Sequence, residues 1–327
     1  MLALFTALCL FSALTASPHV SATPLVVVAE PTTLDPTAPA RTRFGDLTFL
    51  CGYQLRSDDP RFGGLSGLAL DPTGNMLYAI SDHGFGLSAR LFHDANGRLV
   101  YLDMWEIVPL RPPVSQVSDR SRLDAEALVH EPDGSLLVAF EHMHRLWRYP
   151  PSPLAFTTTP QPLAVPGELS RAPANRGIEA MTRLWDGQLL LLSEAFKNHD
   201  ASYKGWIIGQ GRIAPVSYRP TDGYFPTDLA TLANGDLLLL ERRYYPLLGA
   251  AARIRRIART SVQAGARLEG VEIAHLERPL MVDNFEGLAV HESAGMDTRL
   301  YLISDDNYHA FQRTLLLQFR LESRPED

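Results

Sequence analysis

Cysteine is scarce in this sequence, which contains only Cys9 and Cys51. Cys9 lies in an apolar first segment, so a chain without that segment would keep Cys51 alone. A single cysteine excludes an internal disulfide, and packing must therefore stabilise the fold. No catalytic partner accompanies Cys51, and we interpret it as a buried strand residue.

Basic residues are outnumbered, because 30 Lys and Arg accompany 37 Asp and Glu and the formal net charge is −7. A nucleic-acid-binding surface needs the opposite balance, so this class of partner is not expected. The one basic cluster consists of Arg253, Arg255, Arg256 and Arg259, interleaved with isoleucines. We interpret it as a strand with one solvated face, and the alternative is a site for phosphate or another polyanion.

Long apolar runs are missing after the first segment, and no later stretch approaches the ~18 residues that a membrane span needs. Residues 1–22 are apolar, lack Asp, Glu, Lys and Arg, and end in Val20-Ser21-Ala22, which fits a small-residue cleavage site. We predict a signal peptide over residues 1–22, a mature chain that begins at Thr23, and a periplasmic or secreted location. The alternative is an uncleaved membrane anchor, because no Lys or Arg stands near the start.

Several enzyme motifs are also missing. The sequence contains no Gly-x-Ser-x-Gly elbow, P-loop, dinucleotide fingerprint or Cys/His zinc spacing. Serine-hydrolase chemistry by a familiar motif is therefore not supported. Sustained helical periodicity is missing too, which argues against a helical solenoid.

A repeated pattern is present instead, with copies that begin at Leu65, Ala125, Ile178, Thr227 and Phe285. Most copies place Asp-Gly or Asn-Gly between two apolar runs, which is typical of a β-hairpin because the tight turn needs positive φ. The copies recur every roughly 50 to 60 residues, a period typical of four-stranded propeller blades.

We therefore predict an all-β fold, a monomeric five-bladed β-propeller over residues 43–327, after an extended lead-in at residues 23–42. Outer strands are expected at residues 91–93 with 98–102, 145–149, 206–213 and 252–257. After its hairpin the last blade has only the run 314–321, so we expect the N-terminal run 47–55 to complete it and close the ring. The alternative is six blades, one of them degenerate.

Acidic residues recur at the ends of these hairpins. Residues equidistant from a turn face each other, and the resulting pairs are Glu126 with Glu141, Glu179 with Glu194, Asp228 with Glu241, and Glu286 with Asp305, the last pair about the loop at Gly295-Met296. The first copy departs, with Ser66 at the first position and Asp82 at the second. With the hairpins innermost, these acids would gather at one mouth of the channel.

Crowded carboxylates destabilise one another and raise one another's pKa unless a cation intervenes. All nine acids are therefore candidate ligands of Ca²⁺, which takes about six to eight oxygen ligands. The alternative is structural, because acids at strand ends also accept hydrogen bonds from backbone N–H groups of the next blade. The candidate substrate-binding residues near the ring are Arg176, Lys197, Arg242, Arg243 and His142.

Four segments carry a resemblance to the phytase-like family, often described as the esterase-like activity of phytase family. They are Tyr78-Ala-Ile-Ser-Asp-His-Gly84, Phe225-Pro-Thr-Asp228, Leu240-Glu-Arg-Arg243 and Asp283-Asn-Phe-Glu-Gly-Leu-Ala289. The resemblance implies an exported bacterial propeller. By analogy with calcium-dependent propeller phytases, it implies that calcium held by the acids would activate water while basic residues orient phosphate oxygens.

The expected function is metal-assisted hydrolysis of a small-molecule phosphoester or ester at the acidic mouth. Glu179, Asp82 and His83 are the candidate catalytic residues that would activate water. Two alternatives use the same ring: a non-catalytic propeller that binds a ligand or a protein, and a calcium-dependent lactonase-like enzyme.

Overall fold

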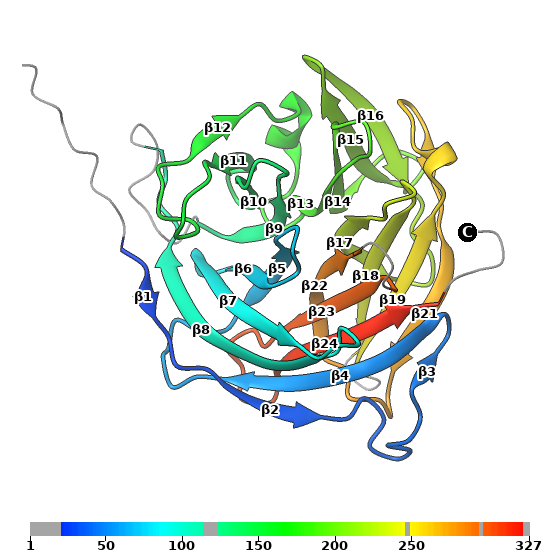
Figure 1. Ribbon diagram of the computed structural model, residues 1–327. Helices are drawn as coiled ribbons and strands as arrows, with labels where there is room; N and C mark the ends of the chain where they lie inside the picture. Colours follow the sequence, from blue (N-terminus) through cyan, green and yellow to red (C-terminus); the bar gives the residue numbers. More distant parts are fainter. Residues whose placement is uncertain (1–20, 114–122, 246–248, 294–296, 323–327) are drawn as a thin grey trace, which may run out of the picture.

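The computed structural model describes residues 21–113, 123–245, 249–293 and 297–322, so the predicted signal peptide up to residue 20 and the Gly295-Met296 loop lie outside it. Five sheets surround a central axis (Figure 1). Their innermost strands are β5 (Leu65–Leu70), β9 (Ala125–His130), β13 (Ile178–Arg183), β17 (Phe225–Thr231) and β22 (Asn284–His291). Each contacts the innermost strands of both neighbouring blades, so the ring is closed. The predicted five-bladed all-β propeller is confirmed, and the six-bladed alternative is wrong.

The repeated segments form the first two strands of each blade. The second and third strands are β6 (Met76–Ser81) and β7 (Phe85–His93), β10 (Leu136–Phe140) and β11 (Arg145–Tyr149), β14 (Leu189–Lys197) and β15 (Tyr203–Gly209), β18 (Leu237–Tyr245) and β19 (Gly249–Ile257), and β23 (Arg299–Asp305) and β24 (Thr314–Leu321). The outer strands are β8 (Leu99–Pro109), β12 (Gln161–Leu163), β16 (Arg212–Tyr218) with β20 (Arg267–Leu268), and β21 (Val271–Glu277). The predicted single strand 206–213 is two strands, because Gln210 and Gly211 both take positive φ and turn the chain.

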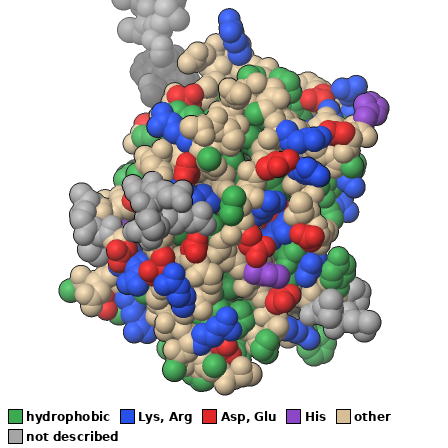
Figure 2. All heavy atoms as spheres, turned by 90° about the vertical axis from the view of Figure 1, so that its right-hand side faces the viewer, with side chains coloured by type: hydrophobic (Ala, Val, Ile, Leu, Met, Phe, Trp, Pro, Cys, Tyr) green, Lys and Arg blue, Asp and Glu red, His purple; other side chains and the backbone are tan. Residues whose placement is uncertain are grey.

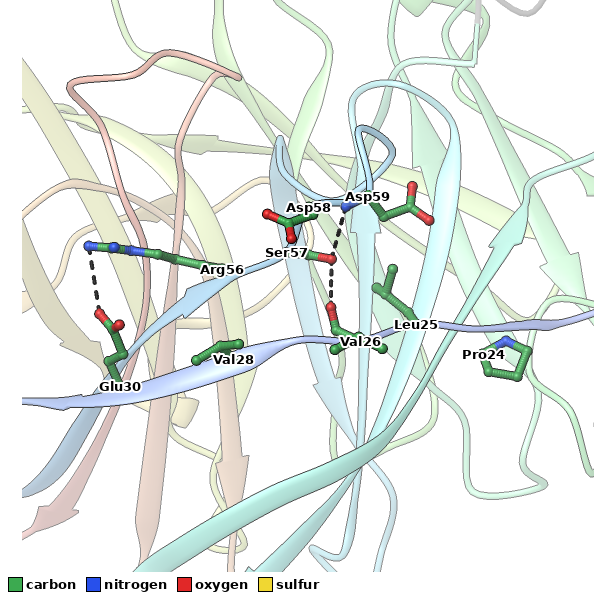
Figure 3. Close-up of a pocket in the computed structure, with 9 residues that line it drawn as sticks. All are labelled: Pro24, Leu25, Val26, Val28, Glu30, Arg56, Ser57, Asp58 and Asp59. Carbon is green, nitrogen blue, oxygen red and sulfur yellow. Dashed lines mark hydrogen bonds and ion pairs between the residues drawn. The ribbon is translucent and has the colours of Figure 1, made fainter.

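The N-terminal segment joins the first and last blades. Strand β4 (Leu47–Arg56) pairs with β24 and completes the last blade, as predicted, and the short β3 (Arg43–Phe44) pairs antiparallel with the start of β4. Strand β2 (Val28–Thr32) pairs with the outer side of β4, and β1 (Thr23–Pro24) pairs with β8 of the first blade. Between the two, Ser57 Oγ donates to the Val26 carbonyl at 2.6 Å beside a cavity of about 430 Å³ (Figure 3).

Every hairpin contains the same irregularity, a β-bulge in its innermost strand. The bulge residues are Ser66, Glu126, Glu179, Thr227 and Glu286. A bulge adds one residue to one strand of a pair and re-aims its side chain. The five blades therefore present these side chains at one level of the ring through a shared backbone feature.

The predicted basic cluster lies on β19 and the 3-10 turn η3 (Arg259–Ser261). Arg253 is 4% exposed and pairs with Glu241 inside the blade, and Arg256 pairs with Asp236 at 2.7 Å. Carboxylates of the protein itself thus engage Arg253 and Arg256, which favours the strand interpretation over the polyanion alternative. The side of the propeller in Figure 2 likewise mixes acidic and basic side chains.

Two further features follow from the described residues. Cys51 is a free cysteine in β4, 6% exposed, which confirms its interpretation as a buried strand residue. The helical content of the described residues consists of η3 and a second 3-10 turn, η2 (Gly167–Arg171). None of their helices is long and apolar enough to span a membrane.

Gly287 tests the closure of the ring. A Cβ added there would lie 2.7 Å from Leu68 Cβ and 3.0 Å from Leu68 N, across the contact between β22 and β5. We expect Gly287→Val to lower the free energy of unfolding by roughly 1–3 kcal/mol, because overpacking separates the blades. Thermal unfolding measures this. Gly167→Ala is the control, since nothing lies within 4 Å of a Cβ at that site, and equal stability of the two variants would contradict the prediction.

Candidate functional site

A second set of side chains lies beside the bulge residues, at the end of the second strand of each blade. The facing pairs of residues are Asp82 with Gly64, Glu141 with Asp124, Glu194 with Gly177, Arg242 with Phe225, and Asp305 with Asn284. We define the acidic ring by its carboxylates, which are Asp82, Asp124, Glu126, Glu141, Glu179, Glu194, Glu286 and Asp305. Arg242 belongs to the same level of the channel mouth.

Two predicted ring acids, Asp228 and Glu241, lie outside this ring. In the fourth blade the bulge falls at Thr227, so Glu241 pairs with Pro226 and Asp228 pairs with Leu240. A shift of one residue moves a side chain to the other face of a strand. Glu241 is fully buried and accepts hydrogen bonds from Arg253 and, at 2.6 Å, from the Tyr218 hydroxyl.

Asp228 has the structural role that the sequence left open as the alternative. Its carboxylate accepts hydrogen bonds from the backbone N–H of Leu229 at 2.8 Å and of Leu288, in the next blade, at 2.7 Å. Asp228 therefore fastens the fourth blade to the fifth, and its carboxylate lies outside the acidic ring.

Sequence reasoning missed Asp124 and Asn284 and gave Arg242 only a general binding role. The signal for the fourth blade was the distance to the turn glycine. Glu126 and Glu179 precede their glycines by eight residues (134 − 126 and 187 − 179), whereas Asp228 precedes Gly235 by seven (235 − 228). The signal for Asp124 and Asn284 was their place in the sequence, because each is a polar residue two positions before the bulge glutamate of its blade.

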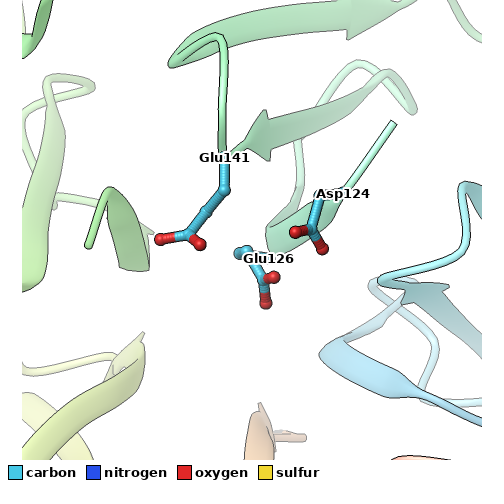
Figure 4. Close-up of side chains that lie close together, drawn as sticks. All are labelled: Asp124, Glu126 and Glu141. Carbon is cyan, nitrogen blue, oxygen red and sulfur yellow. The ribbon is translucent and has the colours of Figure 1, made fainter. Parts of the chain in front are cut away.

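The second blade brings three carboxylates together. Ligand oxygens of Asp124, Glu126 and Glu141 lie within 4.8 Å of one another, and the side chains converge (Figure 4). Glu141 Oε1 also accepts the Gly177 N–H at 2.6 Å, and His142 Nε2 lies 3.0 Å from Asp124 Oδ2. No Arg or Lys among the described residues forms an ion pair with this trio. We call these three residues the blade-two trio.

The fifth blade has the same three positions, occupied by Asn284, Glu286 and Asp305. Asn284 stands where the second blade has Asp124, and its amide Nδ2 donates to Glu286 Oε1 at 2.7 Å and to Asp305 Oδ2 at 3.3 Å. An amide can bridge two carboxylates because it carries two donor hydrogens. An ionised carboxylate at Asp124 offers no donor, so the blade-two trio needs a proton or a cation.

Arg242 supplies positive charge on the other side of the ring. Its Nε lies 3.1 Å from Glu286 Oε1 and its Nη2 lies 3.4 Å from Glu194 Oε1. Arg176 pairs with the second oxygen of Glu194 at 3.0 Å. Burial alone would lower the pKa of Arg242, but Glu286 and Glu194 raise it above its ordinary value, so this guanidinium stays charged.

The remaining basic candidates differ in position. Arg243 pairs with Glu277 at 3.7 Å and lies over the aromatic ring of Tyr224 at 4.5 Å. These contacts direct its guanidinium away from the acidic ring. Lys197 is exposed and lies 5.9 Å from the Tyr203 ring. The structure therefore brings Arg176, Arg242 and His142 to the ring acids, and it leaves Arg243 and Lys197 apart from them.

Burial raises the pKa of the ring carboxyls. Burial together with Asp305 and Asp124 raises the pKa of Asp82 to about 7. Burial raises the pKa of Glu286 to about 7 against the opposing effect of Arg242, and burial with Glu286 raises the pKa of Asp305 to about 8. Burial and the neighbouring carboxylate of Glu179 raise the pKa of Glu126 well above its usual range. For Glu179 the same rise comes from burial and Glu141.

The candidate catalytic residues Asp82 and His83 lie at the edge of the first blade. Asp82 Oδ1 is buried and has no hydrogen-bond partner among the described residues. His83 is exposed, and its ring stacks on Tyr308 at 3.9 Å between centroids and 10° between planes. Glu179, the third candidate, is 7% exposed within the ring. Asp82 Oδ1 is thus positioned to accept a proton, whereas His83 packs on Tyr308.

The sequence matches the phytase-like family, described as esterase-like activity of phytase, over residues 60–308. No curated protein matches it significantly. Among solved structures, a candidate gluconolactonase has 13% identity and a TM-score of 0.46 over 90% of this chain and 93% of that one. A gluconolactonase from Xanthomonas campestris has 11% identity and a TM-score of 0.42 over 93% and 99% of the two chains. Identities this low carry no function from those proteins to this one.

The raised carboxyl pKa values predict how stability depends on pH. A carboxyl with a higher pKa in the folded than in the unfolded protein binds more protons when folded, so its contribution is complete below the ordinary pKa and is lost as the pH rises through the raised one. For Glu286 and Asp305 the window runs from the ordinary values of 4.5 and 3.8 to about 7 and about 8. In EDTA we expect the melting temperature to fall between pH 4.5 and 8.

Two variants define this measurement. Asp305→Asn is expected to reduce the pH dependence of the melting temperature, because it removes one of the groups that must ionise. Glu269→Gln is the matched control, since Glu269 is 56% exposed and lies outside the ring. A melting temperature that rises or stays constant over this range in the wild type would refute the role given to the buried carboxyls.

Proposed function

The chain belongs to the phytase-like family, described as esterase-like activity of phytase, and from this premise we propose that it is a hydrolase that cleaves an ester bond at the acidic mouth of the channel. The observation that supports the proposal most is the contrast between the blade-two trio and its fifth-blade counterpart. In the fifth blade the Asn284 amide bridges the two carboxylates, whereas the three carboxylates of the second blade have no bridging amide among the described residues. The second blade is therefore the part of the ring suited to a cation.

Calcium fits the donor set of this trio. Asp124, Glu126 and Glu141 offer hard carboxylate oxygens that converge within 4.8 Å, and Ca²⁺ prefers such ligands in flexible arrangements. These three residues would hold the ion. Once bound, calcium would polarise an ester oxygen and promote ionisation of water. Magnesium, which demands stricter octahedral geometry, is the second metal to test.

The chain's own side chains supply the remaining chemistry. Arg242 carries a fixed positive charge at the ring and would stabilise negative charge that develops on the substrate. Asp82 has a pKa raised to about 7 and a buried oxygen without a hydrogen-bond partner among the described residues, and it would accept a proton from water and return it to the leaving alcohol. Arg176 and Arg242 hold Glu194 between them, which orients both guanidinium groups at the mouth.

The charge of the ring favours a carboxylic ester over a phosphoester. The carboxylates of the ring outnumber Arg242 and Arg176, the two arginines among the described residues that pair with them. A phosphate group would enter this site against net repulsion, whereas a neutral ester would not. We therefore propose an uncharged ester or lactone as the preferred substrate, and a phosphoester as the weaker candidate.

We further propose that the protein works outside the cytoplasm, in the periplasm or as a secreted protein. The apolar first segment with its small-residue end supports export. Cys51, the one cysteine outside this segment, is consistent with an oxidising compartment, because a single cysteine cannot form a wrong disulfide within the chain.

Calcium binding has a direct test in thermal stability. A ligand bound only by the folded state stabilises it by about 2.7 kcal/mol at one hundred times its Kd. We expect millimolar Ca²⁺ to raise the melting temperature of the wild type by several degrees and EDTA to reverse the shift. Asp124→Asn should abolish the calcium shift and raise the melting temperature in EDTA, because the new amide can bridge Glu126 and Glu141 as Asn284 bridges its neighbours.

Glu269→Gln serves again as the control and should keep the full calcium response. An unchanged wild-type melting curve across calcium and EDTA would leave the ring without a metal. A calcium shift that survives in Asp124→Asn would place the ion elsewhere in the ring.

Catalysis is tested by a hydrolysis screen of the purified protein with Ca²⁺ or Mg²⁺. The substrates are aryl esters, lactones, aryl phosphates and phytate. We expect turnover of esters or lactones above that of phosphates, and we expect Arg242→Gln to lower kcat by about 10²–10³-fold, the usual cost of removing one oxyanion-stabilising donor.

The calcium-induced melting shift of Arg242→Gln separates loss of chemistry from loss of fold. Turnover that survives in a folded Arg242→Gln variant would remove Arg242 from the mechanism. No turnover of any substrate, with the calcium shift intact, would favour the rival function of a propeller that binds a ligand without transforming it.

A further inference from the structure

A groove of about 920 Å³ lies beside the acidic ring, outside the residues assigned above. One wall follows the end of β4, around Gln54 and Phe62, and the other is the loop between β23 and β24, with Tyr308, Phe311 and Gln312. We call it the blade-five groove. Its volume falls within the roughly 300–1,000 Å³ typical of small-molecule sites.

The groove reaches the acidic ring through Tyr308. The Tyr308 ring stacks on His83 at 3.9 Å, next to Asp82 in the chain. A Cβ added to Gly64 would lie 2.1 Å from Asp82 Oδ1 and 2.5 Å from the Tyr308 ring, so both side chains close over that glycine. A molecule in the groove would therefore lie against Tyr308, which lies with the Asp82 carboxyl over Gly64.

Three charged residues that line the groove, Arg56, Asp306 and Arg313, are engaged by the protein itself, and Asp58 adds an exposed carboxylate. Arg313 lies 3.6 Å from Asp283, and Arg56 lies 3.7 Å from Glu30. Asp306 accepts hydrogen bonds from the backbone N–H of Gly64 at 2.9 Å and from Thr314 Oγ1 at 3.0 Å. The groove therefore offers no cluster of unpaired cations for an anionic ligand.

Aromatic faces and neutral polar groups remain available. Phe311 is 88% exposed, the highest value among the exposed large apolar side chains, and the His309 ring lies 5.5 Å from it. The amide of Gln54 stands on one wall, and the amide of Gln312 on the other wall hydrogen-bonds Asp283. Aromatic faces pack against the C–H faces of a sugar ring, while amides donate to and accept from its hydroxyl groups.

We propose that the blade-five groove binds an uncharged sugar ring, so that the ester cleaved at the ring is one carried by a carbohydrate. Phe311 is then the residue that stacks on the sugar and determines specificity. The identity of the ester rests on the proposed hydrolase function, whereas binding of the sugar does not.

Binding of free sugars tests the inference without catalysis. The probes are maltotriose, cellotriose and xylotriose, titrated to millimolar concentration and followed by saturation-transfer NMR and calorimetry. We expect at least one to bind the wild type, and Phe311→Ala to weaken its binding by about threefold to tenfold, the size of one aromatic contact. Phe311→Trp should restore it.

Phe311→Ala is expected to fold normally, because an exposed side chain contributes little to stability. Tyr101→Ala is the matched control, since Tyr101 is 53% exposed on β8 of the first blade, and it should bind as the wild type does. Failure of all three sugars to bind, or binding unaffected by Phe311→Ala, would overturn the inference.

Two more outcomes separate the alternatives. Phe311-dependent binding of 2-naphthol without binding of any sugar would overturn the carbohydrate assignment in favour of an aryl ligand. Phe311-dependent sugar binding without hydrolysis of acetylated sugars would support the groove and count against the proposed hydrolase function.

Discussion

Closing five sheets into a ring brings the starts of five strands to one axis, and in this chain most side chains at that level are carboxylates. Buried carboxylates favour the protonated form, and burial is the largest cause of every raised pKa in the ring. Other side chains at the mouth offset part of the free energy that ionising these buried carboxyls requires. The fourth blade lowers this free-energy cost with Arg242, and the fifth blade lowers it with the amide of Asn284.

The blades therefore divide into neutralised and open sectors. Arg242 and Arg176 offset Glu194, and Arg242 with Asn284 offsets Glu286. The second blade has neither device among its described residues, apart from His142 beside Asp124. An evenly acidic ring would attract cations without orienting a substrate. This ring has a fixed positive charge at Arg242 and uncompensated carboxylates in the second blade, so it can orient a substrate. This asymmetry distinguishes it from a site that only binds cations.

The architecture was predictable because its signals are local. Turn glycines and apolar runs mark every hairpin, and the missing strand of the last blade points to residues 47–55. The ring was only partly predictable, because symmetry about a turn assumes an uninterrupted register. The bulge at Thr227 breaks that assumption, sends Asp228 and Glu241 away from the mouth and brings Arg242 to it. The contrast between Asp124 and Asn284 depends on side-chain contacts that no spacing reveals.

The pairing of β4 with β24 joins segments at opposite ends of the sequence, for example Leu55 with Thr314. We expect such contacts to form late, because closing so long a loop costs entropy that the contacts recover only once they have formed. Four blades can assemble from neighbouring segments, whereas the fifth must wait for both termini. Until then its sheet edges stay open to other chains. The interval before closure is consequently when this protein is most exposed to aggregation, and a chaperone that covers β24 or β4 would act at that step.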